Sequence, residues 1–369
     1  MLNTRHASAG ALLTIDLDAI RANYRLLREN LGGTACAAVV KADAYGLGAD
    51  RVAPALAADG CTTFFVAHLD EAITLRPHVP AEADIFVLHG SPAEVEADFV
   101  AHRVIPVLNS LGQIDAWTSL ASSLGRKLPA VIQVDTGMSR LGLSKRELDI
   151  VAADPHRLDG IDLRYVMSHL ACAEQQSHEL NAFQLANFRT ARALLPAAPA
   201  SFSNSSGVFL GQDYHFDLAR PGAALYGVAP VAGQPNPLRS VVRLQARVIQ
   251  VREIEAGARV GYGGKWTAPG PSRIATISTG YADGFLRSLG NRAKAYHCGT
   301  ALPVVGVVSM DTITLDVTGQ PGQGLEPGDL VDLIGQHNPV DAVAEAAGTI
   351  GYEILTSLGG RYFRTYLGG

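Results

Sequence analysis

The chain has 369 residues, enough for about two domains of ~150–200 residues or one barrel of ~250 residues with an appended unit. Its formal net charge is -5 with both signs interspersed, and no basic run suggests a nucleic acid partner. Four widely spaced cysteines and the lack of a long apolar window argue against a disulfide scaffold, a zinc site and a membrane span. We therefore expect a cytoplasmic protein without a metal site.

The N-terminal part predicts a strand over residues 11–17 and a helix over residues 19–27 capped by Asp16 or Asp18. From residue 35 on, short apolar runs alternate with helix-like stretches. This alternation predicts parallel βαβ units, and eight units of this length predict an N-terminal (β/α)8 TIM-like barrel. A flavodoxin-like sheet, the competing fold, needs fewer strands. The predicted strands are 35–40, 63–67, 85–88, 104–108, 130–134, 163–167, 200–203 and 218–225, and the helices are 51–58, 92–100, 111–124, 145–153 and 179–195.

The pattern changes near residues 235–237, where two prolines flank an asparagine. Beyond them the chain predicts a mainly β domain over residues 238–369, following a barrel domain over residues 11–237. Residues 11–17 are alternatively a strand of the second domain, because the barrel count is complete without them. The predicted elements are strands at 241–251, 273–278, 303–308, 312–317 and 330–334 and short helices at 340–346 and 352–358.

Chemically active side chains follow the predicted barrel strands. In a barrel of parallel strands, functional residues gather where the carboxyl ends of the strands meet. The recurrence of ring nitrogens, guanidinium groups and hydroxyls at these points predicts a site on that face. The residues are Lys41, His68, His89, Asn109, Asp135 with Arg140, His169, Asn204 with Ser205, and Arg220.

Lys41 is the most informative of them, because it ends a buried apolar strand and opens a Gly-rich loop. Partial burial lowers the pKa of an ammonium and favours Schiff-base chemistry with a carbonyl. Ser205 and Gly222, near the last two strands, occupy positions where barrels commonly bind phosphate. A lysine and a phosphate site together suggest pyridoxal phosphate. The alternative is a solvated lysine beyond a strand end, with Ser205 and Gly222 merely forming turns.

Seven motifs occur in order from the first barrel strand nearly to the C-terminus. Together they resemble the alanine racemase family, pyridoxal-phosphate enzymes of fold type III. The motif around Lys41 is the most specific of the seven, whereas GYG alone carries little information. The motifs are VVKADAYGLG (39–48), VDTGMSRLG (134–142), SHLA (168–171), RPG (220–222), GYG (261–263), GYADG (280–284) and SMD (309–311).

The resemblance implies that Lys41 holds pyridoxal phosphate as an aldimine and that Lys41 and Tyr262 are the two acid/base groups. Racemisation by this route requires a base on each face of a planar carbanion. A tyrosine acts as a base at neutral pH only where nearby positive charge favours its ionised form. In the family this tyrosine comes from the β domain of the other subunit, which implies a head-to-tail homodimer with shared active sites. The alternative for Tyr262 is a turn residue packed on Trp266.

The resemblance also assigns the remaining cofactor contacts. Arg220 corresponds to the arginine that faces the pyridine nitrogen, and His169 to the residue that orients it. An arginine cannot readily accept a proton, so the ring nitrogen stays unprotonated and transamination is disfavoured. The other cofactor-binding positions are Tyr45, Asn204, Ser205, Gly222 and Ala223.

For the substrate, the resemblance implies that the backbone amide of Met310 and the side chain of Arg140 lie near its carboxylate. Tyr281 and Asp311 shape the entry from the neighbouring subunit. The implied reaction interconverts L- and D-alanine, to supply D-alanine for peptidoglycan or to consume it in catabolism. Packing alone excludes an added hydroxyl only weakly, so a broad-specificity or serine racemase is an alternative. A decarboxylase and a non-catalytic pyridoxal-phosphate-binding protein are the others.

Two positions depart from the family pattern. Many relatives carry a carbamylated lysine at Gln133 that hydrogen-bonds the arginine numbered Arg140 here, and glutamine cannot be carbamylated. Gly360 stands where many relatives place a tyrosine on the cofactor phosphate. Tyr362, two residues further on, is a candidate to replace that tyrosine.

Overall fold

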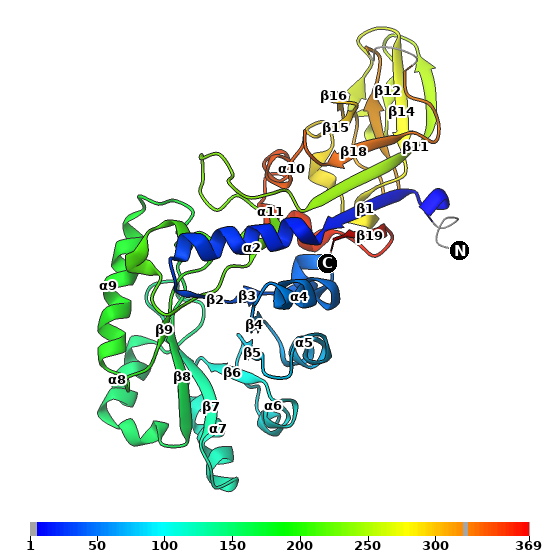
Figure 1. Ribbon diagram of the computed structural model, residues 1–369. Helices are drawn as coiled ribbons and strands as arrows, with labels where there is room; N and C mark the ends of the chain where they lie inside the picture. Colours follow the sequence, from blue (N-terminus) through cyan, green and yellow to red (C-terminus); the bar gives the residue numbers. More distant parts are fainter. Residues whose placement is uncertain (1–5, 320–323, 369) are drawn as a thin grey trace. The chain divides into compact units, whose positions relative to one another are not determined.

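The computed structural model describes residues 6–319 and 324–368. The chain divides into two compact units (Figure 1). The barrel unit comprises residues 20–238, and the β unit comprises the residues up to 19 together with those from 239 on. No helix within the described ranges combines the length and apolar character needed to cross a bilayer.

The barrel unit is built on a curled parallel sheet of seven strands in sequence order. Each strand pairs in parallel with the next, and the helices between them provide the crossovers that parallel pairing requires. The strands are β3 (Ala38–Val39), β4 (Thr63–Val66), β5 (Asp84–Val87), β6 (Ile105–Leu108), β7 (Leu128–Gln133), β8 (Ile161–Met167) and β9 (Ala200–Ser201).

An eighth segment closes the ring. Strand β10 (Leu218–Ala219) pairs in parallel with β2 (Ala35–Cys36), so the first predicted strand is split at Ala37 between two partners. The amide of Arg220 donates to the carbonyl oxygen of Ser203 at 2.9 Å, which joins the eighth segment to the seventh. The expected barrel architecture is confirmed. The strand predicted over 218–225 is much shorter, because Pro221 has no N–H to continue a ladder and the chain then turns.

Most barrel helices lie where the apolar pattern predicts them. The carboxylate of Asp16 accepts a hydrogen bond from the amide of Ala19 at 2.8 Å and caps the first helix. Helix α5 and the short segment α3, whose central residues are left-handed, are not among the predicted helices, and α6 begins four residues later than residue 92. The helices are α2 (Leu17–Leu31), α3 (Lys41–Gly46), α4 (Ala49–Ala58), α5 (Leu69–Leu75), α6 (Glu96–His102), α7 (Leu111–Ser123), α8 (Lys145–Ala153) and α9 (Glu179–Ala193).

The β unit is organised around one long strand, β11 (Val242–Ile254), which pairs with three others. The N-terminal strand β1 (Ala11–Asp16) lies in this sheet between β11 and the C-terminal β19 (Phe363–Leu367). The remaining elements are the hairpin β12 (Arg259–Val260) and β13 (Trp266–Thr267), the strands β14 (Ser272–Ile277), β15 (Lys294–His297), β16 (Thr300–Pro303), β17 (Ile313–Asp316) and β18 (Leu330–Ile334), and the helices α10 (Val340–Ala347) and α11 (Gly351–Ser357).

The strand predicted over 303–308 is wrong. Strand β16 ends at Pro303, and Gly306 takes a φ of +79° that turns the chain out of an extended path. A Cβ at this position would lie 3.0 Å from the carbonyl oxygen of Val260, a tight contact that adds to the strain of the left-handed conformation. The following residues therefore form a loop beside the β12–β13 hairpin.

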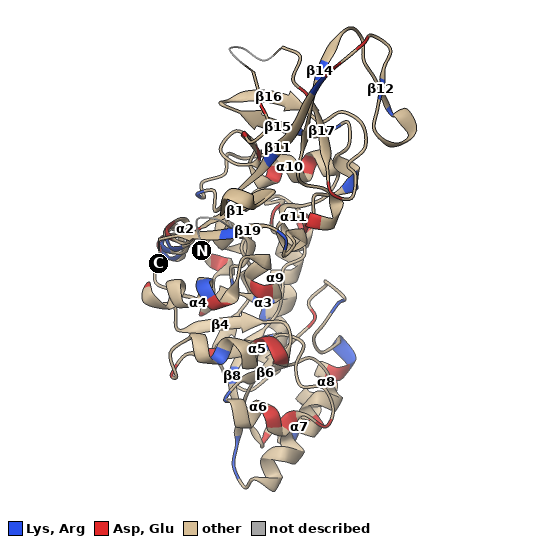
Figure 2. Ribbon diagram, turned by 90° about the vertical axis from the view of Figure 1, so that its right-hand side faces the viewer, with Lys and Arg blue, Asp and Glu red and all other residues tan. Residues whose placement is uncertain are grey.

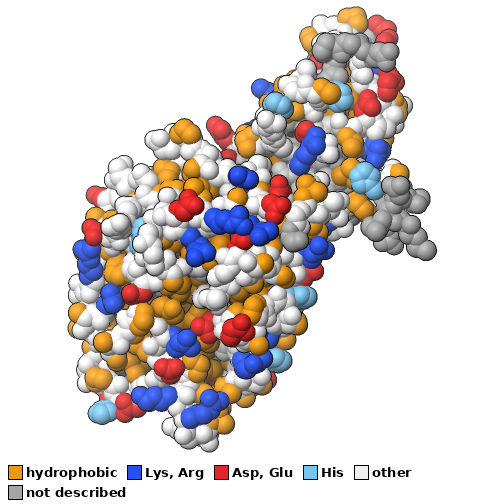
Figure 3. All heavy atoms as spheres, viewed as in Figure 1, with side chains coloured by type: hydrophobic (Ala, Val, Ile, Leu, Met, Phe, Trp, Pro, Cys, Tyr) orange, Lys and Arg blue, Asp and Glu red, His pale blue; other side chains and the backbone are white. Residues whose placement is uncertain are grey.

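Charge is mixed in both units. Figure 2 shows Lys and Arg interspersed with Asp and Glu along the ribbon, and Figure 3 shows the same mixture on one face of the surface. These views agree with the small net charge of the sequence.

Substitution of two glycines in the β unit can separate two contributions to stability: a clash of the new Cβ with the backbone, and the strain of a left-handed conformation. Gly284 has a φ of +93°, and a Cβ there would overlap the carbonyl of Ser357 at the end of α11. Gly257 has a φ of +81° with open space around it. We expect Gly257→Ala to cost about 1–2 kcal/mol for the left-handed conformation. Gly284→Ala should cost about 1–3 kcal/mol more, because backbone atoms cannot rotate away. Urea unfolding of both variants measures the difference, and equal losses would contradict this assignment.

Candidate functional site

The chain leaves strand β3 at Lys41 and enters a left-handed turn. Ala42, Asp43, Ala44 and Tyr45 all have φ between 52° and 57°. This conformation costs roughly 1–2 kcal/mol for each L-residue, so the surroundings must hold it in place. The amide of Ala44 donates to the carbonyl of Val40 at 2.9 Å, and the amide of Gly48 donates to that of Asp43 at 2.9 Å. The turn fixes where the Lys41 side chain begins.

Lys41 is partly buried at this position. Burial lowers the pKa of its ammonium, and the positive charge of Arg140 lowers it further, while the carboxylate of Glu71 acts in the opposite direction. A lower pKa increases the fraction of free amine at neutral pH. The structure therefore supports the nucleophilic character expected of Lys41.

Arg140 belongs to a loop held by one aspartate. The Oδ1 atom of Asp135 accepts hydrogen bonds from the amides of Gly137, Met138 and Ser139, each at 3.0 Å. At the other end of the loop, the side-chain Nε2 of Gln133 donates to the carbonyl of Leu141 at 3.1 Å. Gln133 therefore holds the loop through a hydrogen bond from an uncharged side chain to the loop backbone.

Arg220 is a buried cation, with 4% of its surface exposed. Its guanidinium donates to the carbonyl of Ser168 at 2.7 Å, the hydroxyl of Ser201 at 2.5 Å and Nδ1 of His169 at 3.4 Å. Burial lowers the pKa of Arg220 to about 9, which leaves the group charged at neutral pH. The pKa of His169 lies well below its usual value because of burial and the nearby charge of Arg220. A neutral His169 is the form that can accept from Arg220.

Tyr45, Ser205 and Gly222 meet on the same unit. The hydroxyl oxygen of Ser205 accepts from the amide of Gly222 at 2.9 Å and from that of Ala224 at 3.2 Å. A Cβ at position 222 would overlap the hydroxyl of Tyr45, so only glycine lets these groups converge. Hydroxyls and backbone amides that lie close together are the groups that bind a phosphate in proteins. Ala223 opens the short turn that follows, Ala223–Tyr226.

The other residues that follow barrel strands differ in what their side chains contact. Asn204 uses both ends of its amide on nearby backbone, donating to Leu170 at 3.2 Å and accepting from Gly207 at 2.9 Å. Its predicted cofactor contact remains a prediction. The rings of His68 and His89 pack edge to face with centroids 4.4 Å apart. Lys41, His68, Arg140 and Glu71 all act electrostatically on His89, so these strand ends do lie near one another.

The β unit presents Tyr262 at the tip of the β12–β13 hairpin. The residue is 74% exposed, whereas Trp266 packs against the buried cluster of Val260, Ile274 and Val305. The alternative of a turn residue buried against Trp266 is therefore not observed. An exposed tyrosine between glycines is available to another surface.

Tyr281, Met310 and Asp311 form a second group in the β unit. The amide of Tyr281 donates to Ser309 at 3.0 Å, and the carbonyl of Met310 accepts from Ala282 at 3.0 Å. Arg361 pairs with Asp311 at 2.8 Å and with both carboxylate oxygens of Asp283 at 2.6 and 2.9 Å. This ion-pair network ties the two loops to the C-terminal segment.

Tyr362, the candidate to replace the tyrosine that many relatives place at position 360, is buried in this structure. The residue is 4% exposed, and its hydroxyl is buried without a hydrogen-bond partner among the residues that the structure describes. Burial also raises its pKa. Its contact with the cofactor phosphate remains a prediction.

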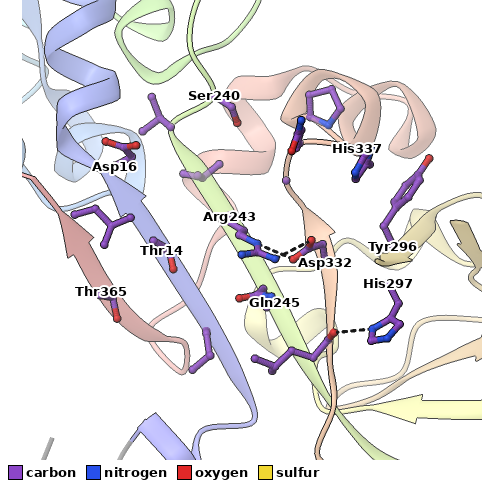
Figure 4. Close-up of a pocket in the computed structure, with 18 of the residues that line it drawn as sticks. Thr14, Asp16, Ser240, Arg243, Gln245, Tyr296, His297, Asp332, His337 and Thr365 are labelled. Carbon is purple, nitrogen blue, oxygen red and sulfur yellow. Dashed lines mark hydrogen bonds and ion pairs between the residues drawn. The ribbon is translucent and has the colours of Figure 1, made fainter. Parts of the chain in front are cut away.

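A cavity of about 990 Å³ lies on the sheet of the β unit, apart from these residues (Figure 4). In it Arg243 pairs with Asp332 at 2.8 Å, and a ring nitrogen of His297 lies 3.3 Å from the carbonyl oxygen of Leu330. The ring of His337 stacks on Tyr296. The cavity includes none of the residues expected to act on a cofactor or substrate.

Three residues of the barrel site were not anticipated. Ser201 accepts from Arg220, and Tyr226 packs on Tyr45 at 4.7 Å and donates to the carbonyl of Val39 at 3.0 Å. Glu71 bonds to the backbone beside Lys41. The only sequence signal for Glu71 is its place three residues after His68, and histidine is not a usual helix-capping residue.

Comparisons with known proteins cover both units. Residues 15–230 match the model for the alanine racemase N-terminal domain and residues 241–366 match that for the C-terminal domain. A relative from Mesorhizobium japonicum, "Alanine racemase, catabolic", is 54% identical over 98% of this chain and 95% of its own length.

Solved structures give the same result. The alanine racemase from Bartonella henselae, with covalently bound pyridoxal phosphate, has a TM-score of 0.95 at 48% identity and covers 97% of this chain and 100% of its own. The biosynthetic alanine racemase from Pseudomonas aeruginosa has a TM-score of 0.91 at 36% identity, with 98% and 100% covered.

Fold, site and comparisons together define an amino-acid isomerase made of a barrel and a β unit. The chain belongs to the alanine racemase family.

The low pKa of His169 makes stability depend on pH. Its unfolded form binds a proton below about pH 6.5, whereas its folded form stays neutral to lower pH. Its contribution is therefore present above pH 6.5 and is lost as the pH falls. Between about pH 6.5 and 5.5, wild type should lose about 1 kcal/mol more unfolding free energy than His169→Gln.

Urea unfolding at the two pH values measures this difference. His156 provides a control of opposite sign. A hydrogen bond to Asp159 raises its pKa, so the stability that it contributes increases as the pH falls. Parallel losses in wild type and His169→Gln would contradict a neutral His169.

Proposed function

We propose that this chain binds pyridoxal 5'-phosphate in the barrel unit and uses Lys41 and Tyr262 as the two proton-transfer groups of alanine racemisation. The observation that carries the proposal is the partly buried Lys41, whose pKa is lowered by burial and by the charge of Arg140, on the unit that also holds the Tyr45, Ser205 and Gly222 cradle. An amine and a phosphate site together match the two ends of this cofactor.

Bound in this way, the cofactor supplies an electron sink that makes the α-hydrogen of an amino acid acidic. The cradle formed by the Tyr45 hydroxyl, the Ser205 hydroxyl and the backbone at Gly222 and Ala223 would hold its phosphate. Arg220 offers only donors, so a ring nitrogen beside it stays unprotonated. An unprotonated ring nitrogen makes the cofactor a weaker electron sink. This favours return of the proton to the α-carbon over transamination.

Two residues would move the proton. Lys41 Nζ takes it from, or returns it to, one face of the α-carbon, and Tyr262 Oη acts on the opposite face. A single base would exchange the hydrogen but return it to the same face. Inversion of configuration therefore requires both groups.

Tyr262 is proposed to act on the barrel unit of a second copy, in a head-to-tail homodimer. Its 74% exposure on a short hairpin supports this, because the side chain has little contact within its own unit. Tyr281, Met310 and Asp311 lie on loops of the same unit and would line the entry, and the Met310 amide with Arg140 would bind the substrate carboxylate.

Four free thiols support a cytoplasmic setting for the enzyme.

Substitution of the two bases tests the mechanism. Lys41→Ala and Tyr262→Phe should each lower the interconversion of L- and D-alanine by at least about 100-fold, the usual contribution of general acid–base catalysis. Tyr296→Phe, which removes a hydroxyl elsewhere in the β unit, should stay within about twofold of wild type. Chiral chromatography of the products in both directions gives the rates. Near-normal turnover by Tyr262→Phe would rule out the second base.

A further inference from the structure

Glu71, in helix α5, bridges the ends of two neighbouring barrel strands. Its Oε1 atom accepts from the amide of Ala42 at 2.6 Å, directly after Lys41. Its Oε2 atom accepts from the amides of Ala67 and His68 at 2.7 and 3.1 Å, directly after strand β4. Strands β3 and β4 are paired, with Val39 opposite Phe65, so the carboxylate links adjacent positions at one edge of the barrel.

The bond to Ala42 lies where the backbone most needs support. Ala42 is the first of the four left-handed residues, and none of the four is glycine. A hydrogen bond to a carboxylate is stronger than one to a neutral acceptor. At the far side of the turn, the carboxylate of Asp43 accepts from the amide of Ala49 at 2.7 Å. Two carboxylates thus hold the entrance and the exit of a strained turn.

Glu71 also sets the charge around Lys41. Two charged groups act on Lys41, and they oppose each other, Arg140 favouring the free amine and Glu71 favouring the ammonium. The same two groups act on His89, together with His68 and Lys41. A single carboxylate therefore contributes both to where the lysine stands and to how readily it holds a proton.

We propose that Glu71 is the positioning residue for Lys41, fixing the left-handed turn that carries it and balancing the charge of Arg140. This inference rests on the proposed function, in which Lys41 is the cofactor-binding lysine. In this role Glu71 acts through its hydrogen bond to the backbone of Ala42 and through its charge.

The competing explanation is an ordinary helix cap. Glu147 provides a matched control, because it caps α8 by accepting from the amide and hydroxyl of Ser144 at 2.9 and 2.8 Å. It also reaches a neighbouring element, accepting from the amide of Leu111 at 3.3 Å. Glu147 thus repeats the capping geometry of Glu71 without touching the segment that follows Lys41.

The test compares Glu71→Gln with Glu147→Gln in the full-length protein. An amide offers one acceptor oxygen, so it cannot accept at both strand ends. We expect Glu71→Gln to weaken pyridoxal phosphate binding at least about tenfold, the effect of losing a charged hydrogen bond. We also expect the pH midpoint for acetylation of Lys41 by acetic anhydride, read by peptide mass spectrometry without cofactor, to fall by about half a unit or more.

Glu147→Gln should change neither quantity, although it should lose comparable thermal stability. If the two variants behave alike in cofactor affinity and in the acetylation midpoint, the inference is overturned. If Glu71→Gln does not fold, the cofactor affinity of Glu71→Asp tests the proposal instead. This substitution keeps the charge but shortens the reach, so cofactor affinity should fall several-fold while Glu147→Asp stays unchanged, and an equal effect in both would refute the proposal.

A separate measurement distinguishes this inference from the proposed function. Borohydride reduction of wild type with pyridoxal phosphate, followed by peptide mapping, should place the label on Lys41. A label elsewhere would refute the proposed function. A label on Lys41 with an unaffected Glu71→Gln would refute only the role of Glu71.

Discussion

The left-handed turn after Lys41 is the constraint on which the barrel site depends. A buried strand ends at the lysine, and within a few residues the chain must turn into helix α4. The turn does this by placing four L-residues at positive φ, a conformation that persists only when the surroundings determine it. Because the turn starts at Lys41 and contains Tyr45, the lysine and the tyrosine of the phosphate cradle are fixed together. The fit between Tyr45 and Gly222 then ties the first strand to the eighth segment.

The second constraint is a cation kept inside the barrel. Burying a charge is costly unless its donors are bonded, and Arg220 gives its donors to a carbonyl, a hydroxyl and a neutral imidazole. No carboxylate is among these partners, so the positive charge remains available to whatever lies beside it. His169 must stay neutral to accept from Arg220, which explains why its pKa and the position of the guanidinium are linked. An acidic partner would neutralise the charge and reverse the electronic effect proposed for this arginine.

Much of the fold could be predicted from the sequence, and the reasons are local. Strand and helix alternation gave the barrel, and helix α8 lies at its predicted bounds because a serine cap and an apolar stripe mark it. The positions of Lys41, His169 and Arg220 followed from their place after apolar runs. The left-handed turn could not be predicted, because alanine and tyrosine carry no preference for positive φ. The link between Glu71 and the Lys41 turn could not be predicted either, because the amide of Ala42 is 29 residues away in the sequence and comes near Glu71 only through strand pairing.

The most direct test of the account is complementation between the two half-sites. Lys41→Ala and Tyr262→Phe chains, each purified inactive, are mixed after mild dissociation and allowed to re-form dimers. If each site combines Lys41 of one chain with Tyr262 of the other, half of the random dimers carry one intact site, and activity returns to about a quarter of wild type. If both groups act within one chain, every site carries one substitution. The mixture would then remain inactive despite proven exchange of subunits, and the shared-site mechanism would be contradicted.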